Sequence, residues 1–247
     1  LACGSAINPS RFQNQIRRFE EHDMANPPPS QAVLFVGSSS IRMWQNLTEV
    51  TSMPVIQRGF GGSTLEQALY FADRVILNYA PRSVVIYSGE NDIATNVSSP
   101  ERVECELQQL AARIFDINAT VIFISIKPSP TRWSHWPLMR SANAALAAFA
   151  AAEPRLTYVD VATPMLGSNG EPRPELFIED GIHLNNLGYA LWKQSVRPVL
   201  TDVLGVPSSS PPPSRTHPWL PQSLPPQLPP SPLRPPSPPP APPPPSL

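Results

Sequence analysis

Five short apolar runs, rich in β-branched residues, alternate along the chain with longer segments in which apolar residues recur every three or four positions. Short apolar runs are typical of strands buried on both faces, and the longer spacing is typical of amphipathic helices. Strands that alternate with helices predict right-handed crossovers and a parallel sheet with helices on both faces. The expected strands cover 33–37, 55–60, 83–89, 120–126 and 156–161.

Capping residues mark the beginnings of several helices. Ser63 with Glu66 three positions later predicts a capping box for a helix that follows the second strand. Ser99 followed by Pro100 predicts an N-cap and a first-turn proline for a helix over about 100–116. Further helices are expected before the first strand, over roughly 138–152 and after Asn185.

Proline is distributed unevenly, with 20 of the 35 prolines of this 247-residue chain in residues 207–247. Such a segment favours polyproline II and buries too little apolar surface to fold. We therefore predict three parts: an N-terminal leader remnant over 1–7, one α/β domain over 8–205, and a Pro-rich disordered tail over 206–247.

The charge of the chain argues against nucleic acid as a ligand. The 206 residues before the proline-rich segment carry 16 basic and 19 acidic side chains, whereas phosphate binding relies on clustered Lys and Arg. The longest apolar run, 121–126, is also far shorter than a membrane-spanning helix requires. We expect neither nucleic-acid binding nor a membrane span.

Two cysteines are too few for a disulfide framework. Leu1-Ala2-Cys3-Gly4 resembles the end of a bacterial lipoprotein signal, which would make Cys3 a lipid anchor, while Cys105 is expected to pack as a small apolar side chain. With such an anchor the protein would be tethered in a bacterial envelope. Otherwise Cys3 lies in a disordered start, and a periplasmic, secreted or cytoplasmic location is open.

Polar residues follow three of the expected strands. Ligands of open parallel sheets bind outside the carboxyl ends of the strands, so these positions are where chemistry is expected. The first strand runs through Gly37-Ser38-Ser39-Ser40 into a helix, whose free N–H groups could hold an oxyanion if a serine attacks a carbonyl. The alternative is a plain N-cap.

The second and third strand ends carry glycines and an amide. Gly59, Gly61 and Gly62 allow close backbone approach to a ligand or a tight turn, and no phosphate-binding glycine motif is present. Asn91, in Gly-Glu-Asn-Asp, could donate to an oxyanion while Asp92 braces the loop, or could form an Asx turn.

A later segment carries Asp180 and His183, three positions apart, so that the carboxylate can fix the imidazole tautomer. His22, His135 and His217 have no acid at such a spacing. Four scattered histidines without paired cysteines predict no metal site.

Together these four elements resemble the SGNH (GDSL-type) hydrolase family of serine esterases, in its bacterial GDSL-like lipase/acylhydrolase branch. The family's nucleophile turn, glycine loop, Gly-x-Asn-Asp loop and Asp-x-x-His are matched in order over about 30–200. The resemblance implies a three-layer α/β/α sandwich with a central, mainly parallel five-stranded sheet, the flavodoxin-like SGNH fold.

The resemblance also implies roles for individual residues. Alignment on Gly-x-Ser favours Ser39 over Ser38 and Ser40 as nucleophile, although Ser38 replaces the family's aspartate. His183 would be the base and Asp180 its orienting acid. The oxyanion would bind the backbone N–H of Ser39, the backbone N–H of Gly62 (favoured over Gly59 and Gly61) and the amide of Asn91.

The implied activity is hydrolysis of small-molecule acyl esters without a cofactor, with carbohydrate deacetylation as the natural task. The alternatives are lysophospholipase or thioesterase activity, or a non-catalytic glycan-binding module. Trp133 and Trp136, after the fourth strand, could wall a substrate pocket or cover the core. The sequence leaves the oligomeric state open.

Overall fold

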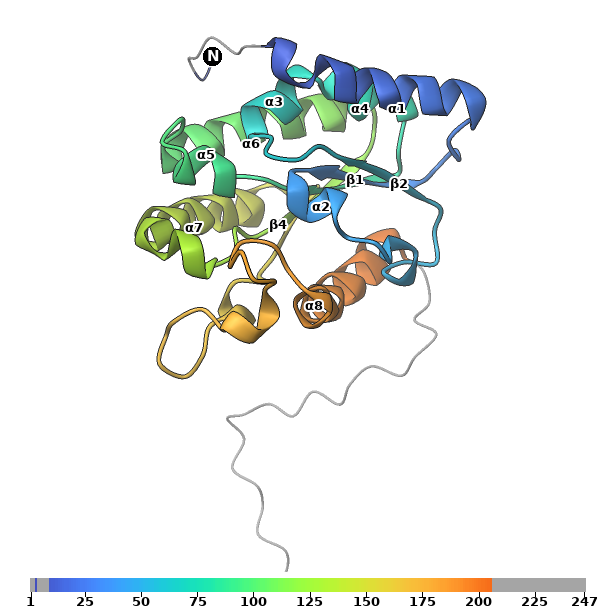
Figure 1. Cartoon of the computed structure of the whole chain (residues 1–247). Coiled ribbons are helices and arrows are strands. Elements are labelled where there is room, and N and C mark those ends of the chain that lie inside the picture. Colours follow the sequence, from blue (N-terminus) through green and yellow to red (C-terminus); the bar gives the residue numbers. More distant parts are fainter. Residues whose placement is uncertain (1–2, 4–8, 206–247) are drawn as a thin grey trace, which may run out of the picture. The chain divides into compact units, whose positions relative to one another are not determined.

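A computed structural model describes residue 3 and residues 9–205 and shows the expected α/β architecture (Figure 1). The five strands form one sheet in the order β2-β1-β3-β4-β5, and every neighbouring pair is parallel. The predicted strands are confirmed, although four of them end one or two residues earlier than the apolar runs do. The strands are β1 (Val33–Gly37), β2 (Val55–Gly59), β3 (Ser83–Tyr87), β4 (Thr120–Ile124) and β5 (Leu156–Val159).

Helices occupy both faces of the sheet. The α-helices are α1 (Gln13–Ala25), α2 (Ser39–Arg42), α3 (Leu65–Tyr70), α4 (Ala72–Val75), α5 (Glu90–Ala94), α6 (Pro100–Asp116), α7 (Trp136–Ala152) and α8 (Asn186–Leu204). Short 3-10 helices lie at Pro9–Phe12, Leu47–Glu49, Leu77–Tyr79, Pro130–His135, Thr163–Met165 and Pro174–Leu176. None of these described helices is long and apolar enough to cross a membrane.

Two apolar clusters form the core, because alternate residues of a strand point to opposite faces of the sheet. Leu34 and Val36 pack with α1, α3, α4, α6 and α7, whereas Val33 and Phe35 pack with α2 and α8. In Figure 1 α3 and α6 lie on one side of the strands and α8 on the other. The three-layer sandwich predicted from the sequence is therefore confirmed.

One predicted helix cap, at Ser99, is confirmed, and the other, at Ser63, is not. The side chain of Ser99 accepts from the N–H of Arg102 at the start of α6, and that of Asn185 caps α8. The predicted capping box at Ser63 is wrong: Thr64 and Gln67 form it one position later. The hydroxyl of Thr64 accepts from the N–H of Gln67, whereas the hydroxyl of Ser63 is buried and makes no hydrogen bond to the described residues.

The strand order creates the place where a ligand site can form. In the order 2-1-3-4-5, connections from β1 and β3 leave the sheet in opposite directions, which opens a crevice at the carboxyl ends of these two strands. Ser39 follows β1 and Asn91 follows β3. The topology thus places the first and third predicted polar elements side by side.

A buried carboxylate holds this edge together. Asp92 accepts from the N–H of Gly89 at 2.9 Å and from the N–H of Leu65 at 2.8 Å. Asp92 therefore ties the turn after β3 to the start of α3, as predicted for a bracing aspartate. Burial raises the pKa of Asp92 to about 6, although both N–H donors oppose the shift.

Cys3 is the one described residue that precedes residue 9. The predicted leader remnant, apart from Cys3, and the predicted Pro-rich tail with His217 lie outside the described residues. Cys3 forms a disulfide with Cys105 of α6. The expectations of a lipid anchor at Cys3 and of a free, packed Cys105 are therefore corrected, because a sulfur in a disulfide cannot also carry a lipid thioether.

We expect loss of this disulfide to destabilise the domain. It links positions separated by 102 residues, and cross-links over long loops restrict the unfolded chain. Cys105→Ser should lower the free energy of unfolding by about 2–4 kcal/mol, measured by urea denaturation without reductant. If reductant shifts the wild-type curve no more than it shifts that of the variant, the bond does not contribute.

The pH dependence of stability follows from two buried carboxyls. Burial and the nearby charge of Asp92 raise the pKa of Glu106 to about 7, although Arg102 bonds it. Groups whose folded pKa is raised stabilise the fold below their ordinary pKa, and that contribution is lost as the pH rises through the folded value. We expect the free energy of unfolding to fall by a few kcal/mol between about pH 4 and pH 8, since one pKa unit corresponds to about 1.4 kcal/mol.

The Glu106→Gln variant should flatten this profile above about pH 5, because its amide does not titrate. Glu104→Gln, two residues away on the same helix, is the control and should keep the wild-type slope. Equal slopes for Glu106→Gln and wild type would contradict the assignment.

Candidate active site

A sharp turn after β1 presents the hydroxyl of Ser39. Gly37 has φ of +146°, and a Cβ there would lie 2.0 Å from the carbonyl oxygen of Tyr87. Only glycine fits this close approach of β1 to the end of β3. The extended Ser38 follows as N-cap of α2, and α2 is held by Gln57, whose side chain donates to the carbonyls of Ile41 and Trp44.

Ser39, His183 and Asp180 form a continuous hydrogen-bonded line. Ser39 Oγ lies 2.9 Å from His183 Nε2, and His183 Nδ1 lies 2.5 Å from Asp180 Oδ2. The loop that carries the last two residues is fixed by Thr131, whose hydroxyl donates to the carbonyl of Asp180 at 2.6 Å. Residues 144 positions apart in sequence are thereby brought within hydrogen-bonding distance.

Asp180 is held in its charged form. Its partial burial raises the pKa, but three hydrogen bonds outweigh this: from the N–H of His183, from the imidazole of His183 and from the N–H of Ile182. The resulting pKa is about 2. A carboxylate that stays ionised can fix the imidazole tautomer with Nδ1 protonated and leave Nε2 to accept a proton.

The amide of Asn91 has a defined orientation. Arg132 Nη1 lies 2.9 Å from Asn91 Oδ1, and because arginine only donates, the amide oxygen must face it. The nitrogen of Asn91 therefore points the other way and donates to the carbonyl of Ser63 at 2.9 Å. One N–H of the amide remains for a ligand.

Two backbone donors complete the set. Within the described part of the chain, the N–H groups of Ser39 and Gly62 make no hydrogen bond. Gly62 has φ of +79°, a conformation that favours glycine. These N–H groups and the amide of Asn91 are the three donors predicted from the sequence.

A buried charge network lies behind Asn91. Glu90 forms an ion pair with the fully buried Lys127 and accepts from the hydroxyls of Tyr87 and Ser129 at 2.7 and 2.6 Å. Arg132 lies 3.3 Å from the same carboxylate. Burial would raise the pKa of Glu90, but the charges of Lys127 and Arg132 hold it below its ordinary value.

This network fixes Arg132, and Arg132 in turn fixes Asn91. Burial lowers the pKa of Lys127, an effect that the charge of Glu90 opposes. A buried ion pair of this kind costs desolvation energy and often adds little stability. Its consequence here is geometric: the guanidinium is held by a carboxylate on one side and orients the amide on the other.

A cavity of about 720 Å³ opens over these groups. It is lined by Ser39 and His183, by Gly61, Gly62 and Asn91, and by side chains from the first helix. Phe19 is the only large apolar side chain among the described residues that line it. The remaining lining residues are Arg11, Asn14, Gln15, Arg18, Arg42 and Arg132.

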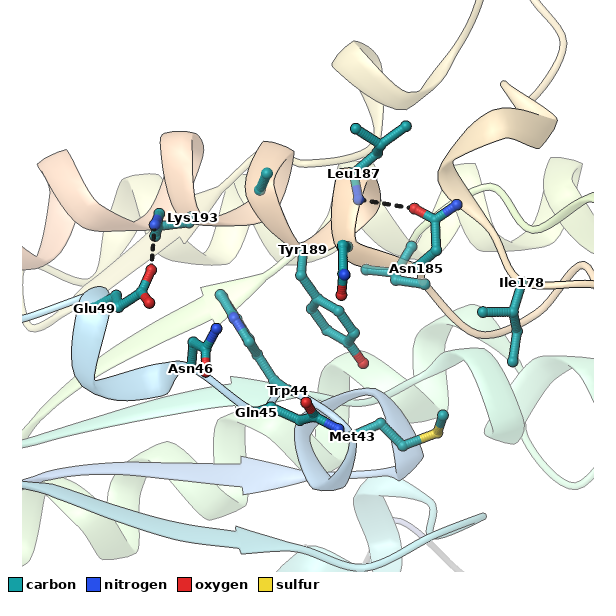
Figure 2. Close-up of a pocket in the computed structure, with 13 residues that line it drawn as sticks. Met43, Trp44, Gln45, Asn46, Glu49, Ile178, Asn185, Leu187, Tyr189 and Lys193 are labelled. Atoms are coloured by element: carbon teal, nitrogen blue, oxygen red, sulfur yellow. Dashed lines mark hydrogen bonds and ion pairs between the residues drawn. The ribbon is translucent and has the colours of Figure 1, made fainter.

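A second cavity, of about 840 Å³, lies between α8 and the segment after α2 and, among the described residues, shares no lining residue with the cavity at Ser39 (Figure 2). Trp44 and Tyr189 stack beneath it at 5.6 Å, and Lys193 pairs with Glu49 at 2.6 Å. None of the described residues that line it is a serine or a histidine. The candidate active site is therefore the cavity at Ser39.

The structure distinguishes the predicted site residues that line the cavity from those that lie outside it. Ser38 and Ser40 are buried, whereas Ser39 is the serine that meets the imidazole. The prediction that Trp133 and Trp136 wall the pocket is corrected: the two rings stack 5.8 Å apart and pack on the core, outside this cavity. Helix α7 begins at Trp136 and turns that ring inward.

Sequence reasoning did not single out Lys127, Arg11, Arg18 and Arg42. A lysine directly after a strand core is a signal for the first of these, since a buried lysine requires a buried partner. The three arginines carry no such local signal. Among the described residues, no three His, Cys, Asp or Glu side chains gather in a way that could hold a metal ion.

Solved structures share this fold. A GDSL-like lipase from Bacteroides thetaiotaomicron matches with a TM-score of 0.67 and 24% identity, over 76% of this chain and 97% of that one. A Bacteroides fragilis protein assigned as an acylhydrolase gives 0.66 and 25%, over 81% and 99%. An acetylxylan esterase mutant from Geobacillus stearothermophilus gives 0.59 and 13%, over 71% and 95%.

Sequence comparison adds the family. No curated protein sequence matches the chain significantly. The sequence model of the GDSL-like lipase/acylhydrolase family matches residues 35–191, a range that contains Ser39, Gly62, Asn91, Asp180 and His183. With a match over more than half of its length, the chain belongs to the GDSL-like lipase/acylhydrolase family of hydrolases.

Proposed function

We propose that this protein is a serine esterase that removes small acyl groups, chiefly acetyl, from esters through an acyl-enzyme. The observation that carries the proposal is the hydrogen-bonded line from Ser39 through His183 to Asp180. A serine next to an imidazole that is oriented by a carboxylate is the arrangement that activates a hydroxyl as nucleophile.

In the first half-reaction Ser39 Oγ attacks the ester carbonyl while His183 Nε2 takes the hydroxyl proton. The carbonyl becomes an oxyanion, and Asp180 stabilises the imidazolium. When the tetrahedral intermediate collapses, the bond to the alcohol breaks and His183 returns the proton to it. The acyl group stays on Ser39.

In the second half-reaction His183 takes a proton from water, which attacks the acyl-enzyme. Collapse releases the carboxylic acid and restores the Ser39 hydroxyl with that proton. The chemistry requires no cofactor. In both halves the oxyanion would be bound by the N–H groups of Ser39 and Gly62 and by the amide of Asn91. Loss of one such donor typically lowers kcat by about 10²–10³-fold.

The lining of the cavity supports a short acyl group. A long acyl chain gains affinity from apolar surface, and Phe19 is the only large apolar side chain among the described residues around this cavity. A polar wall suits a hydroxylated alcohol such as a sugar. Carbohydrate deacetylation is therefore the proposed natural task, and the acetylxylan esterase named above shares the fold.

We further propose an exported location, in the periplasm or outside the cell. Support comes from the disulfide between Cys3 and Cys105, because disulfides persist in oxidising compartments and are rare in the cytosol of mesophiles.

Removal of individual groups should separate their roles in hydrolysis of p-nitrophenyl acetate. We expect Ser39→Ala to lower kcat by about 10⁶-fold and Asn91→Ala by about 10²–10³-fold, with unchanged circular dichroism. His183→Ala should lower kcat about as far as Ser39→Ala does. His135→Ala is the control, since the side chain of His135 bonds only its neighbour Ser134 in the described structure. Near-native turnover of Ser39→Ala would overturn the proposal.

Acyl-length preference tests the substrate class. Because the cavity wall is polar, kcat/KM should be highest for p-nitrophenyl acetate and should fall steadily through butyrate to octanoate. An optimum at octanoate would instead favour a lipid or thioester substrate. Binding of acetylated sugars without any turnover would favour the non-catalytic glycan-binding alternative.

A further inference from the structure

Arginines surround the candidate active site. Four of the residues that line its cavity are Arg11, Arg18, Arg42 and Arg132, and no lining residue in the described part of the chain is a glutamate or aspartate. The whole chain has 18 basic and 19 acidic side chains, so its composition does not account for this concentration.

The four arginines differ in what they bind. Arg132 pairs with Glu90 and donates to the amide oxygen of Asn91, so its role is to orient that amide. Within the described structure, Arg11, Arg18 and Arg42 form no ion pair with a carboxylate, and all three are exposed.

Helix α1 has three acids: two are paired with arginines, and the third, Glu21, is exposed and does not line the cavity. Glu20 pairs with Arg74, and Asp23 pairs with Arg58, at 2.6 Å in each case. Both contacts join α1 to the elements beneath it rather than to the cavity. Of the charged side chains of α1, a helix that the structure describes in full, Arg18 alone lines the cavity.

Two of the unpaired guanidinium groups touch the loop that carries an oxyanion donor. A Cβ on Gly62 would lie 3.1 Å from Arg11 Nη2, and a Cβ on Gly61 would lie 2.9 Å from Arg42 Nε. Arg11 and Arg42 therefore lie against the glycine loop, close to where a bound ester would react.

We propose that Arg11, Arg18 and Arg42 form a subsite for an anionic group, a carboxylate or a phosphate, on the ester substrate. The inference rests on the proposed esterase function and narrows it to acyl esters of acidic molecules. Guanidinium groups suit this task because they stay charged and bind both anions through two parallel hydrogen bonds. A cavity lined by one sign of charge also concentrates oppositely charged substrates.

The test compares acetate release from three aryl acetates: para-acetoxybenzoate, its neutral methyl ester and para-acetoxyphenyl phosphate. For each enzyme variant we take the ratio of kcat/KM of an anionic ester to that of the neutral ester. The difference in intrinsic reactivity between the esters cancels when ratios are compared between variants. The two anionic esters distinguish a carboxylate subsite from a phosphate subsite.

We expect the ratio to fall about tenfold in Arg18→Gln and in Arg42→Gln, the size expected for one hydrogen bond to a charged group. It should fall similarly in Arg11→Gln. The matched control is Arg17→Gln: Arg17 is exposed, precedes Arg18 on α1 and does not line the cavity. In the wild type the ratio should also decrease as salt is raised from about 50 to about 500 mM, because ions screen exposed charges.

Ratios that stay at the wild-type value in all three variants would overturn the proposal, as would an equal fall in Arg17→Gln. Such a result, with neutral ester still hydrolysed through Ser39, would leave the esterase function standing. If no ester is hydrolysed, the proposed function fails. In that case calorimetry on the Ser39→Ala protein decides the subsite: it must bind para-acetoxybenzoate more tightly than the methyl ester.

Discussion

Asp92 is buried and accepts hydrogen bonds from the N–H of Gly89 and the N–H of Leu65. One carboxylate therefore sets the distance between the turn after β3 and the start of α3. Asn91 precedes Asp92 on that turn, and Gly62 lies just before α3, so the same contact places two of the three proposed oxyanion donors. Burial of this carboxylate raises its pKa to about 6, which is a cost the fold carries in order to keep the two loops in register.

A buried ion pair orients the side-chain amide of Asn91 through Arg132. The ion pair of Glu90 with Lys127 lies in the interior, where charges need partners. It holds Arg132 through Glu90, and Arg132 determines which end of the Asn91 amide faces the cavity. An amide that is oriented before the substrate arrives needs no reorganisation when an oxyanion forms, and such preorganised donors are most effective for catalysis.

The charges around the site fall into two groups with different roles. The first group, Asp180 and the pair of Glu90 with Lys127, has partners within the protein. These charges hold the candidate catalytic groups His183 and Asn91 in position. The second group, Arg11, Arg18 and Arg42, lines the cavity and has no carboxylate partner in the described structure. This contrast is the basis of the proposed preference for acidic ester substrates.

Local signals were sufficient for much of this description. The five strands, the N-cap at Ser99, the helix after Asn185 and the Asp180–His183 pair could be predicted because each depends on residues within a few positions of one another. The capping box was misplaced by one residue because Ser63 and Thr64 are adjacent residues that both suit an N-cap, and only the fold determines that the hydroxyl of Thr64 meets the N–H of Gln67.

Contacts between distant segments were decided only by the tertiary structure. Cys3 meets Cys105, and Lys127 meets Glu90, across spans that carry no pairing signal in the sequence. Trp133 and Trp136 turned toward the core because α7 packs there, and three arginines from two separate segments came together at one cavity. The sequence determined which groups could do the chemistry, since that follows from residue type and short spacing. Packing determined which of them meet and what surrounds them, because distance and burial depend on the whole sheet and its helices.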